Sequence, residues 1–372
     1  MDEILGSPPE KRNQIPYMYD PLWLEYEKHY QIFHGLQFVK DLSIDTPLFY
    51  CPILLFKDRR EGEKFYCRGY NNGIAGPFFK QNKSPSSTDV RSTVGINRLH
   101  LKSRTTKINE AYRLIWNKIA NEVTPVESLT IIQYPRYSYY CHHLLRPTND
   151  NLPHTVKYWN AMAYMHQVSN ESNESNLGAS IKAELNTTLR NRLNRYDCGT
   201  TYDQKLIEVI DHHTDRKRIC ETFCAYRHKH TELSGRETKP DICWNILEQL
   251  IHAGKAILVH YSQSEFVYFL YSTEFSYYAS NACTRGAEIG TILIYEAMKW
   301  VIAHGCSLIY YGEMVDERGV RPTSQTMEFF QTMEFSQKLL QISRYKEKFS
   351  NTIFQGYSLE TMRCAPHPST AT

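Results

Sequence analysis

The sequence contains no long uninterrupted apolar run. Its 372 residues include no stretch of about 18 apolar residues, the shortest that a membrane-spanning helix needs. The beginning, MDEILGSPPEKRNQIP, carries acidic side chains and no apolar core of its own, unlike a secretory signal. We therefore expect a chain that has no transmembrane segment and works in the cytoplasm.

A strong charge of one sign is also missing. The 43 lysines and arginines exceed the 40 acidic residues by only 3, a balance too mild to favour duplex DNA as the main ligand. The 10 cysteines are scattered, and without a signal segment they indicate reduced thiols rather than a disulfide framework. We expect no DNA partner.

Two nucleotide-binding motifs are absent as well. Neither G-x-G-x-x-G nor G-x-x-x-x-G-K-[ST] occurs, which disfavours a Rossmann dinucleotide site and a P-loop NTPase. The composition itself is ordinary, with 41% hydrophobic and 22% charged residues, so the chain is able to bury a core. Its length exceeds that of one average domain and favours two.

The order of predicted elements indicates the fold class. In the second half, helices are followed by strands at 255–262 and 265–280, the second either bent or split, then a glycine-containing turn, a helix that stops at Gly305, and a strand at 306–313. This order is typical of an α/β layer around a mixed sheet. Other predicted helices cover 19–33, 106–123, 181–196, 203–212, 214–231 and 241–253, and a charged turn joins hairpin strands at 46–57 and 63–70.

Four segments of the second half carry a resemblance to a known family. They are LRNRLNRYDCGT (189–200), ILIYEAMKWVIAHG (292–305), LIYYGE (308–313) and ISRYKEKFS (342–350). Together, in this order and spacing, they resemble the GNAT acyltransferases, and within them the FemABX-type branch, in which two GNAT-like domains are joined in one chain. The resemblance is carried by residues from about 180 to 350.

The resemblance implies an α/β (α+β) fold of two GNAT-like domains, each with a mixed central sheet flanked by helices. The expected division is a disordered N-terminus (1–16), a degenerate N-terminal domain (17–180), an acyltransferase domain (181–351), and a tail (352–372) that returns to the first domain. The implied activity is N-acyl transfer from acyl-CoA to an amino group of a cell-envelope sugar or peptide precursor. Aminoacyl-tRNA as donor, and a non-catalytic binding protein of the same fold, remain open alternatives.

The resemblance also places a lysine near the reaction centre, and Lys346 is the matching residue. A cation there would stabilise the oxyanion that forms when an amine attacks an activated carbonyl. Acyl transfer further needs a proton acceptor and a proton donor. Glu313 is the candidate acceptor and Tyr311 the candidate donor, with Tyr310 as the alternative donor, since only one of the two tyrosines can point into the cleft. Tyr310, which points to the opposite face of its strand, is a candidate for substrate binding. Solvated positions for Lys346 and Glu313, and packing roles for the tyrosines, are the alternatives.

The turn RGAEIG before the predicted helix has glycines and a cation. Arg285, Gly286 and Gly290 could hold the pyrophosphate of a donor through backbone amides and the helix dipole. A plain tight turn leading into a core helix explains the same residues, and the sequence leaves both readings open.

Basic residues are densest near the end of the 181–196 helix. Arg190, Arg192 and Arg195 could bind a sugar-nucleotide diphosphate or the acceptor arm of a tRNA. A solvated helix face is the alternative for such a run.

A metal alternative arises from the segment CETFCAYRHKH. A spacing of four places Cys220, Cys224 and His228 along one helix face, with His230 close behind. However, no second cysteine pair at finger-like spacing completes a tetrahedral zinc site. We therefore expect a core-facing helix and no metal.

Overall fold

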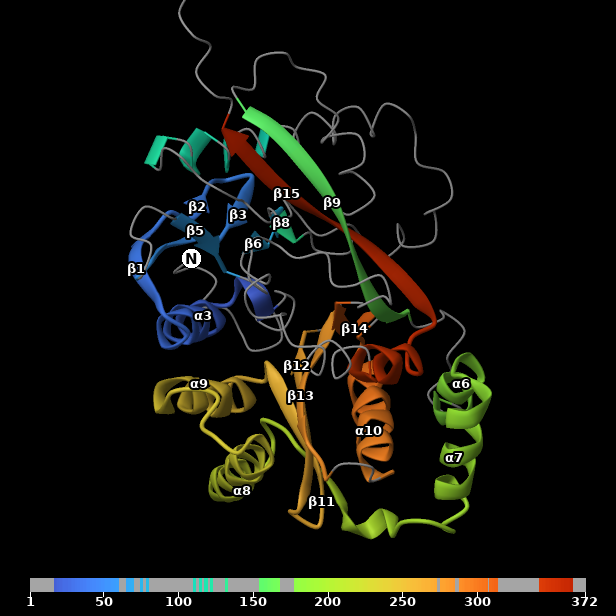
Figure 1. Ribbon diagram of the computed structural model, residues 1–372. Coiled ribbons are helices and arrows are strands. Elements are labelled where there is room, and N and C mark those ends of the chain that lie inside the picture. The colour runs from blue at the N-terminus through green and yellow to red at the C-terminus, as the bar shows by residue number, and fades with distance from the viewer. Residues whose placement is uncertain are drawn as a thin grey trace, which may run out of the picture. The chain divides into compact units, whose positions relative to one another are not determined.

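A computed structural model shows the chain as two compact units (Figure 1). Unit 1 comprises Met1–Leu22 and Met162–Phe354, and unit 2 comprises Trp23–Ala161 and Gln355–Thr372. Residues 1–16, predicted to be disordered, lie outside the described residues. The structure describes 17–59, 65–69, 74–75, 78–79, most of 110–122, 131–132, 154–167, 177–272, 275–284, 288–306, 308–313 and 341–363, with only the backbone for 74–75, 79, 131–132, 154–167, 313 and 352–363.

Unit 2 contains short strands packed on helical residues. Strand β4 pairs with β5 in the antiparallel hairpin that the sequence predicts. Ala111, Ile115 and Ile119 are helical, recur every fourth residue and are buried against Phe49 and Leu55, which confirms the predicted helix at its described residues. The strands are β1 (Leu36–Asp41), β2 (Ile44–Asp45), β3 (Phe49–Cys51), β4 (Leu54–Asp58), β5 (Phe65–Arg68), β6 (Ile74–Ala75), β7 (Phe78–Phe79) and β8 (Ile131–Ile132).

Helix α3 (Pro21–Phe33) lies within the segment 19–33 that is expected to be helical and begins directly after Asp20. The Asp20 carboxylate accepts a hydrogen bond of 2.9 Å from the backbone N–H of Leu22, and proline suits the first helical position because it has no N–H to satisfy. Just before it, Tyr17–Tyr19 form a buried 3-10 turn. The Tyr17 ring stacks on Phe275 and Tyr277 at 6.0 and 6.1 Å, so this early segment is part of the core of unit 1.

The largest sheet has the strand order β10-β11-β12-β13-β14-β9-β15, and its first five strands belong to unit 1. Strands β13 and β14 are parallel, whereas β10–β11, β11–β12, β12–β13 and β14–β9 pair antiparallel. The sheet is therefore mixed, as expected. The strands are β9 (His154–Gln167), β10 (Ile207–Ile210), β11 (Ala256–Tyr261), β12 (Glu265–Tyr271), β13 (Ser276–Ala282), β14 (Leu308–Glu313) and β15 (Thr352–Arg363).

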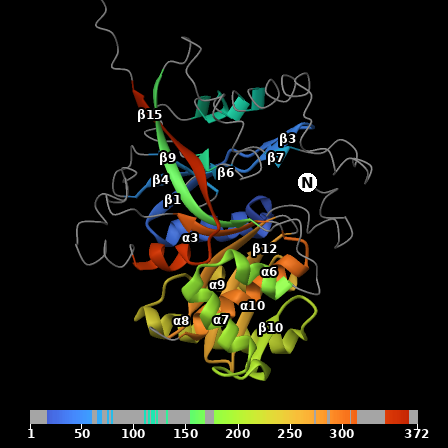
Figure 2. The ribbon, with the colours of Figure 1, turned by 90° about the vertical axis from the view of Figure 1, so that its right-hand side faces the viewer.

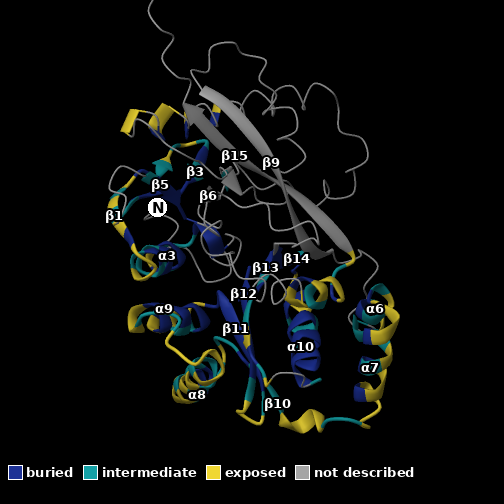
Figure 3. Cartoon of the chain, viewed as in Figure 1, coloured by how far each residue is buried: buried dark blue, intermediate teal, exposed yellow. Residues whose placement is uncertain are grey.

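Helices cover both faces of the strands of unit 1 (Figures 1 and 2). Helices α6, α7 and α10 lie on one face, with α6 and α7 in front of α10 in Figure 2, and α8 and α9 pack on the other. Helix α10 is buried on nearly every side (Figure 3), as expected for a helix that is apolar all round. The bounds are α6 (Leu177–Glu184), α7 (Thr187–Asp197), α8 (Arg216–Ser234), α9 (Asp241–His252) and α10 (Ile289–Ala303).

The predicted stop of α10 is confirmed. Gly305 has φ +89°, and its N–H donates to the carbonyl of Ile302 at 2.9 Å, the left-handed ending that glycine favours. No helix in the described part of the chain is both long and apolar enough to cross a membrane.

Two predicted helices differ from the structure. The single helix expected over 181–196 is divided into α6 and α7, because Asn186 caps a new helix by accepting a hydrogen bond from the N–H of Leu189. The helix expected over 203–212 is wrong. Residues 203–212 form a 3-10 turn, Gln204–Leu206, followed by strand β10. Ile207, Val209 and Ile210 are β-branched, which favours a strand, and β10 gains backbone pairing with β11 at the sheet edge. Tertiary pairing therefore overrides the helical pattern in this short segment.

Candidate functional site

The parallel strands β13 and β14 pair only briefly. Within the described residues their register is limited to Ser276 opposite Ile309 and Tyr277 opposite Tyr310, although both strands continue. On its other side, β13 shifts register against β12, leaving Ala279 as an extra residue. An extra residue bends a strand and increases its twist. The bend explains why β13 stops pairing with β14 just after Tyr277.

Strand β14 has a matching irregularity. Its register against β9 shifts between Tyr310 and Gly312, with Tyr311 as the extra residue. Gly312 has φ +96°, a conformation that residues with a Cβ rarely adopt. Both strands are thus distorted directly beyond their last shared pair, and the backbone groups that follow on their facing edges are not paired with each other.

Lys346, which lies 34 residues after Gly312 in the sequence, contacts the place where β13 and β14 separate. It lies in the helical residues 341–347 and is partly buried. A Cβ atom built on Gly312 would lie 2.7 Å from Lys346 Nζ and 4.0 Å from a ring carbon of Tyr277. The ammonium group therefore occupies the space directly above the Gly312 backbone, at the place where β13 and β14 separate.

Tyr311 is wholly buried beside α10. Its ring lies 6.1 Å from that of Tyr278 and 5.8 Å from that of Phe349. Burial raises the pKa of its hydroxyl far above the usual range, so the phenol keeps its proton. The hydroxyl has no hydrogen-bond partner among the described residues, an uncommon situation for a buried polar group.

Tyr310 packs on the opposite face, 5.4 Å from the Tyr277 ring and 6.0 Å from Phe275. The two neighbouring tyrosines therefore face different sides, as the alternation of a strand predicts. Glu313 ends β14, and its backbone lies opposite Ala163, but its side chain is outside the described residues.

The start of α10 is packed tightly on the end of β13. A Cβ on Gly290 would lie 3.3 Å from Cys283 Sγ and 3.7 Å from the Tyr345 hydroxyl, so glycine permits the close approach. Thr291 Oγ1 lies 3.5 Å from the same Tyr345 hydroxyl, whose pKa burial raises to about 12. Tyr345 thus contacts the first turn of α10 while its neighbour Lys346 reaches Gly312. Arg285 and Gly286 lie outside the described residues.

Two of the three candidate arginines gather at the same helix start. Arg192 Nη2 lies 2.9 Å from Glu288 Oε1, and Arg195 Nη2 lies 3.9 Å from it. Arg192 Nε is buried and has no hydrogen-bond partner among the described residues. Glu288, immediately before α10, makes no side-chain hydrogen bond to the helix. Its carboxylate offsets one of the two positive charges at a helix end that attracts anions.

Arg190 is engaged elsewhere. Its guanidinium donates to the carbonyls of Lys182, Ala183 and Leu185 at 2.9, 2.8 and 3.0 Å, which are acceptors left open at the end of α6. Arg190 therefore stabilises the α6–α7 connection, and the structure does not bring it to Glu288.

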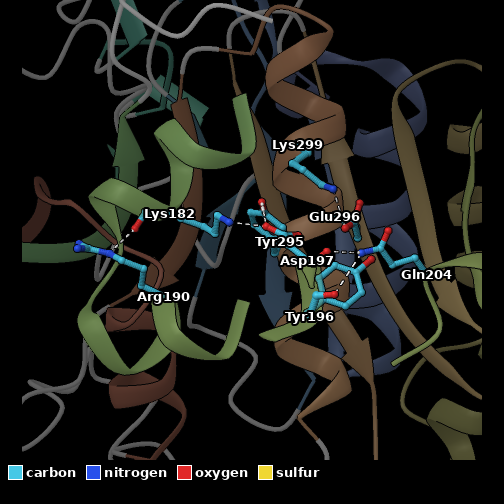
Figure 4. A network of polar contacts seen from close by, with 8 residues as sticks. All are labelled: Lys182, Arg190, Tyr196, Asp197, Gln204, Tyr295, Glu296 and Lys299. Carbon is cyan, nitrogen blue, oxygen red and sulfur yellow. Dashed lines mark hydrogen bonds and ion pairs between the residues drawn. The ribbon is translucent and has the colours of Figure 1, made fainter. Parts of the chain in front are cut away.

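A polar network fixes α7 against α10 (Figure 4). Asp197 forms an ion pair with Lys182 and accepts a 3.5 Å hydrogen bond from the Tyr295 hydroxyl. One residue further along α10, Glu296 pairs with Lys299 at 2.7 Å. The contacts of Asp197 anchor the end of α7 that carries Arg192 and Arg195.

No local sequence pattern points to the residues that hold the turn after β13. Glu265 accepts hydrogen bonds of 2.5 and 2.6 Å from the backbone N–H and the hydroxyl of Thr284. Tyr345 was missed for the same reason, because its partners Thr291 and Gly290 are distant in the sequence. Only three-dimensional packing identifies these contacts.

Comparison with solved structures gives the fold. The crystal structure of FemX superposes with a TM-score of 0.55, at 11% sequence identity over 92% of this chain and 92% of that chain. This chain has the fold of FemX. The expected α/β class and the resemblance to the FemABX-type branch are thereby confirmed. No protein-family model and no curated protein sequence matches the chain.

Two further solved structures are similar to this chain at lower TM-scores. The C-terminal domain of a protein named as a lysylphosphatidylglycerol synthetase from Agrobacterium fabrum has a TM-score of 0.48, at 8% identity over 92% of this chain and 90% of that chain. L-PGS from Bacillus licheniformis has a TM-score of 0.46, at 12% identity over 95% of each chain. Of these three structures, FemX alone exceeds a TM-score of 0.5 and supports the fold.

Proposed function

We propose that this chain is an N-acyltransferase that moves an acyl group from an activated donor to an amine. The position of Lys346 above Gly312, where β13 and β14 separate, carries the proposal. When the amine attacks the donor carbonyl, negative charge develops on the carbonyl oxygen. A fixed ammonium group beside that oxygen stabilises the charge, an effect often worth about 3 kcal/mol.

The reaction needs one group that accepts a proton and one that donates a proton, and we propose the two sequence neighbours of Gly312 for these roles. The new C–N bond requires that the amine lose a proton, and the broken C–S or C–O bond leaves a group that takes one up. Glu313, next to Gly312 on β14, is the proposed acceptor, directly or through water. Tyr311 is the proposed donor, because its phenol carries a proton at neutral pH and its hydroxyl has no partner among the described residues.

Acyl-CoA is the proposed donor. Beyond Tyr277 the backbone of β13 is not paired with β14, and an unpaired strand edge binds chain-like ligands that carry amides, such as the pantetheine arm of CoA. At the end of β13, Arg192 and Arg195 stand beside the start of α10, where a pyrophosphate is stabilised. The Gly290 and Gly286 amides and the Arg285 side chain are proposed to complete this phosphate site.

Glu288 forms ion pairs with the two arginines that the phosphate would contact. Its partner Arg195 is mostly exposed, and Arg192 is about one-third exposed, and such pairs contribute roughly 0–1 kcal/mol. A doubly charged pyrophosphate is therefore able to displace the carboxylate.

Aminoacyl-tRNA is the second candidate donor, favoured by the fold that this chain shares with FemX. The ester carbonyl would then meet the same lysine. For either donor, the proposed acceptor is an amino group of a cell-envelope sugar or peptide precursor, with Tyr310 as a proposed contact.

Ligand-induced stabilisation separates the candidates. A ligand present at 100 times its Kd stabilises the folded chain by about 2.7 kcal/mol, so the thermal midpoint is measured with CoA, with charged tRNA and with UDP-sugars. We expect CoA to raise it. A rise with tRNA alone would establish the second donor, and no response to either would identify a non-catalytic binding protein.

Turnover of Lys346→Ala tests the mechanism. We expect loss of transfer by about 100-fold to 1,000-fold with donor binding retained. The exposed neighbour Lys348 provides the matched control, and Lys348→Ala should transfer at the wild-type rate. Unchanged turnover of Lys346→Ala would remove this lysine from the mechanism.

A further inference from the structure

Helices α8 and α9 bring three metal-ligating side chains together on the sheet face opposite α10. Cys220 comes from α8, and Glu248 and His252 come from α9. Their ligand atoms all lie within 4.8 Å of one another. Cys220 Sγ donates to Glu248 Oε1 at 2.8 Å, and His252 Nε2 lies 3.6 Å from that same oxygen. None of the three takes part in the proposed acyl transfer.

The packing of the two helices fixes this geometry. Glu248 and His252 are four residues apart, so they share one face of α9. Near the other end of the helix pair, Arg227 of α8 contacts Asp241 of α9. The helices therefore run antiparallel, which places Cys220 opposite the last turns of α9. The buried Trp244, Leu247 and Leu250 hold α9 in place.

The three ligand types favour a metal ion between the hard and soft classes, such as Zn²⁺. A thiolate, an imidazole and a carboxylate are the ligand types of zinc sites, and three protein ligands leave a fourth position for water. Zinc bonds of about 2.0–2.3 Å in a tetrahedron imply ligand atoms roughly 3.3–3.7 Å apart. The 3.6 Å between His252 Nε2 and Glu248 Oε1 matches this spacing.

We infer that Cys220, Glu248 and His252 bind one Zn²⁺ ion that joins α8 to α9. On binding, the Cys220 thiol releases its proton to solvent and the sulfur becomes a thiolate ligand. In the metal-free chain the thiol proton bridges Cys220 Sγ and Glu248 Oε1. Zn²⁺ takes the place of this proton, and a small rotation of the cysteine side chain lengthens the distance between Sγ and Oε1 to that of two zinc ligands. The sequence suggested partners for Cys220 on its own helix, whereas the structure supplies them from α9.

Metal titration of the full chain tests this site without any transfer assay. The chelator-treated protein is titrated with Zn²⁺ against a colorimetric chelator, with Mg²⁺ as the hard-cation control. We expect one tightly bound Zn²⁺ that stabilises the chain, and no competition by Mg²⁺. Substituting Co²⁺ should produce a thiolate-to-metal absorption band in the near ultraviolet.

Three variants locate the ion. Removing an outer partner of a metal ligand already weakens binding by about 10-fold to 100-fold, so Cys220→Ser and His252→Ala should each weaken it by more than about 100-fold, and Cys220→Ser should abolish the cobalt band. Cys224, exposed one turn further along α8, is the matched control, and Cys224→Ser should bind as the wild type does.

Absence of bound Zn²⁺, or an ion that survives both Cys220→Ser and His252→Ala, would overturn the inference and leave a thiol–carboxylate hydrogen bond in its place. Circular dichroism confirms that each variant is folded. If Cys220→Ser does not fold, Glu248→Gln, which keeps the size of the side chain, replaces it in the titration.

Discussion

The ammonium group of Lys346 lies where a side chain on Gly312 would have to be, 2.7 Å from a Cβ built on that residue. Gly312→Ala should therefore displace the lysine and also strain a backbone at φ +96°. We expect transfer to fall about 100-fold and the free energy of unfolding to fall by about 1–2 kcal/mol, measured by turnover and urea denaturation.

Gly235 is the matched control for this substitution. It also has a positive φ, +66°, but a Cβ there would meet no atom within 4 Å. Gly235→Ala should lose stability without losing turnover. Equal activity of the two variants would show that the Gly312–Lys346 contact does not matter for the reaction.

Glu288 pairs with Arg192 and Arg195, the residues proposed to bind the donor phosphates, so neutralising it should strengthen donor binding. For Glu288→Gln we expect the KM for acyl-CoA to fall about twofold to fivefold at low salt, the range that an exposed ion pair of up to ~1 kcal/mol allows. Arg192→Gln should raise the KM. The exposed Glu221 pairs with Lys217 on α8, and Glu221→Gln, with the same change in charge, should leave the KM unaltered. A KM that rises in Glu288→Gln would contradict the assigned phosphate site.

Gly178 of α6 abuts the hydroxyl of Tyr295, which lies 2.6 Å from a Cβ built on the glycine, whereas the next ring atom lies at 3.8 Å. Tyr295 is buried and rigid, so Gly178→Ala should cost about 1–3 kcal/mol of stability. In a Tyr295→Phe background the oxygen is gone and the cost should nearly vanish. Urea denaturation of the four proteins in this cycle gives the coupling, expected at about 1–2 kcal/mol; strictly additive effects would refute the contact.

His230 should make the chain less stable in acid. Burial lowers its pKa to about 4 from an ordinary value near 6.5, as its ring packs 5.3 Å from Trp244. Between these two pH values His230 is protonated in the unfolded chain but not in the folded chain. Its contribution to the free energy of unfolding is therefore complete above about pH 6.5 and decreases as the pH falls towards 4.

Replacing His230 by glutamine should reduce the loss of unfolding free energy between pH 7 and pH 4.5 by about 2 kcal/mol, allowing for the partial exposure of the ring. Urea denaturation at pH 4.5 and at pH 7 measures the difference. The exposed His228, half a turn earlier on α8, is the control, and His228→Gln should keep the wild-type slope. A His230→Gln variant with an unchanged slope would assign the acid sensitivity to other groups.

The sequence predicted those features that depend on local pattern. Helix α10 and its end at Gly305 follow from apolar content and a glycine stop, and the α3 start follows from Asp20 and Pro21. The segment containing Lys346 was singled out by its resemblance to a family. Its contact with Gly312 joins residues 34 positions apart and results from packing, which no local pattern encodes.

Other features depend on partners that periodicity cannot identify. Strand β10 was predicted as a helix because its pairing with β11 lies outside its own segment. Arg190 and Arg192 are neighbours in one basic run, yet one bonds to the end of α6 and the other to Glu288. Cys220 likewise finds Glu248 and His252 on a different helix.

The core of unit 1 joins the earliest and the latest described parts of the chain. Tyr17 packs on Tyr277, and Lys346 lies over Gly312. During synthesis on the ribosome, Tyr17 can therefore pack on Tyr277 only after about 260 further residues have been made, and the contact between Lys346 and Gly312 forms later still. Contacts so distant in sequence make folding slow. A product truncated before Lys346 would lack the contact with Gly312 on which the proposed transfer depends.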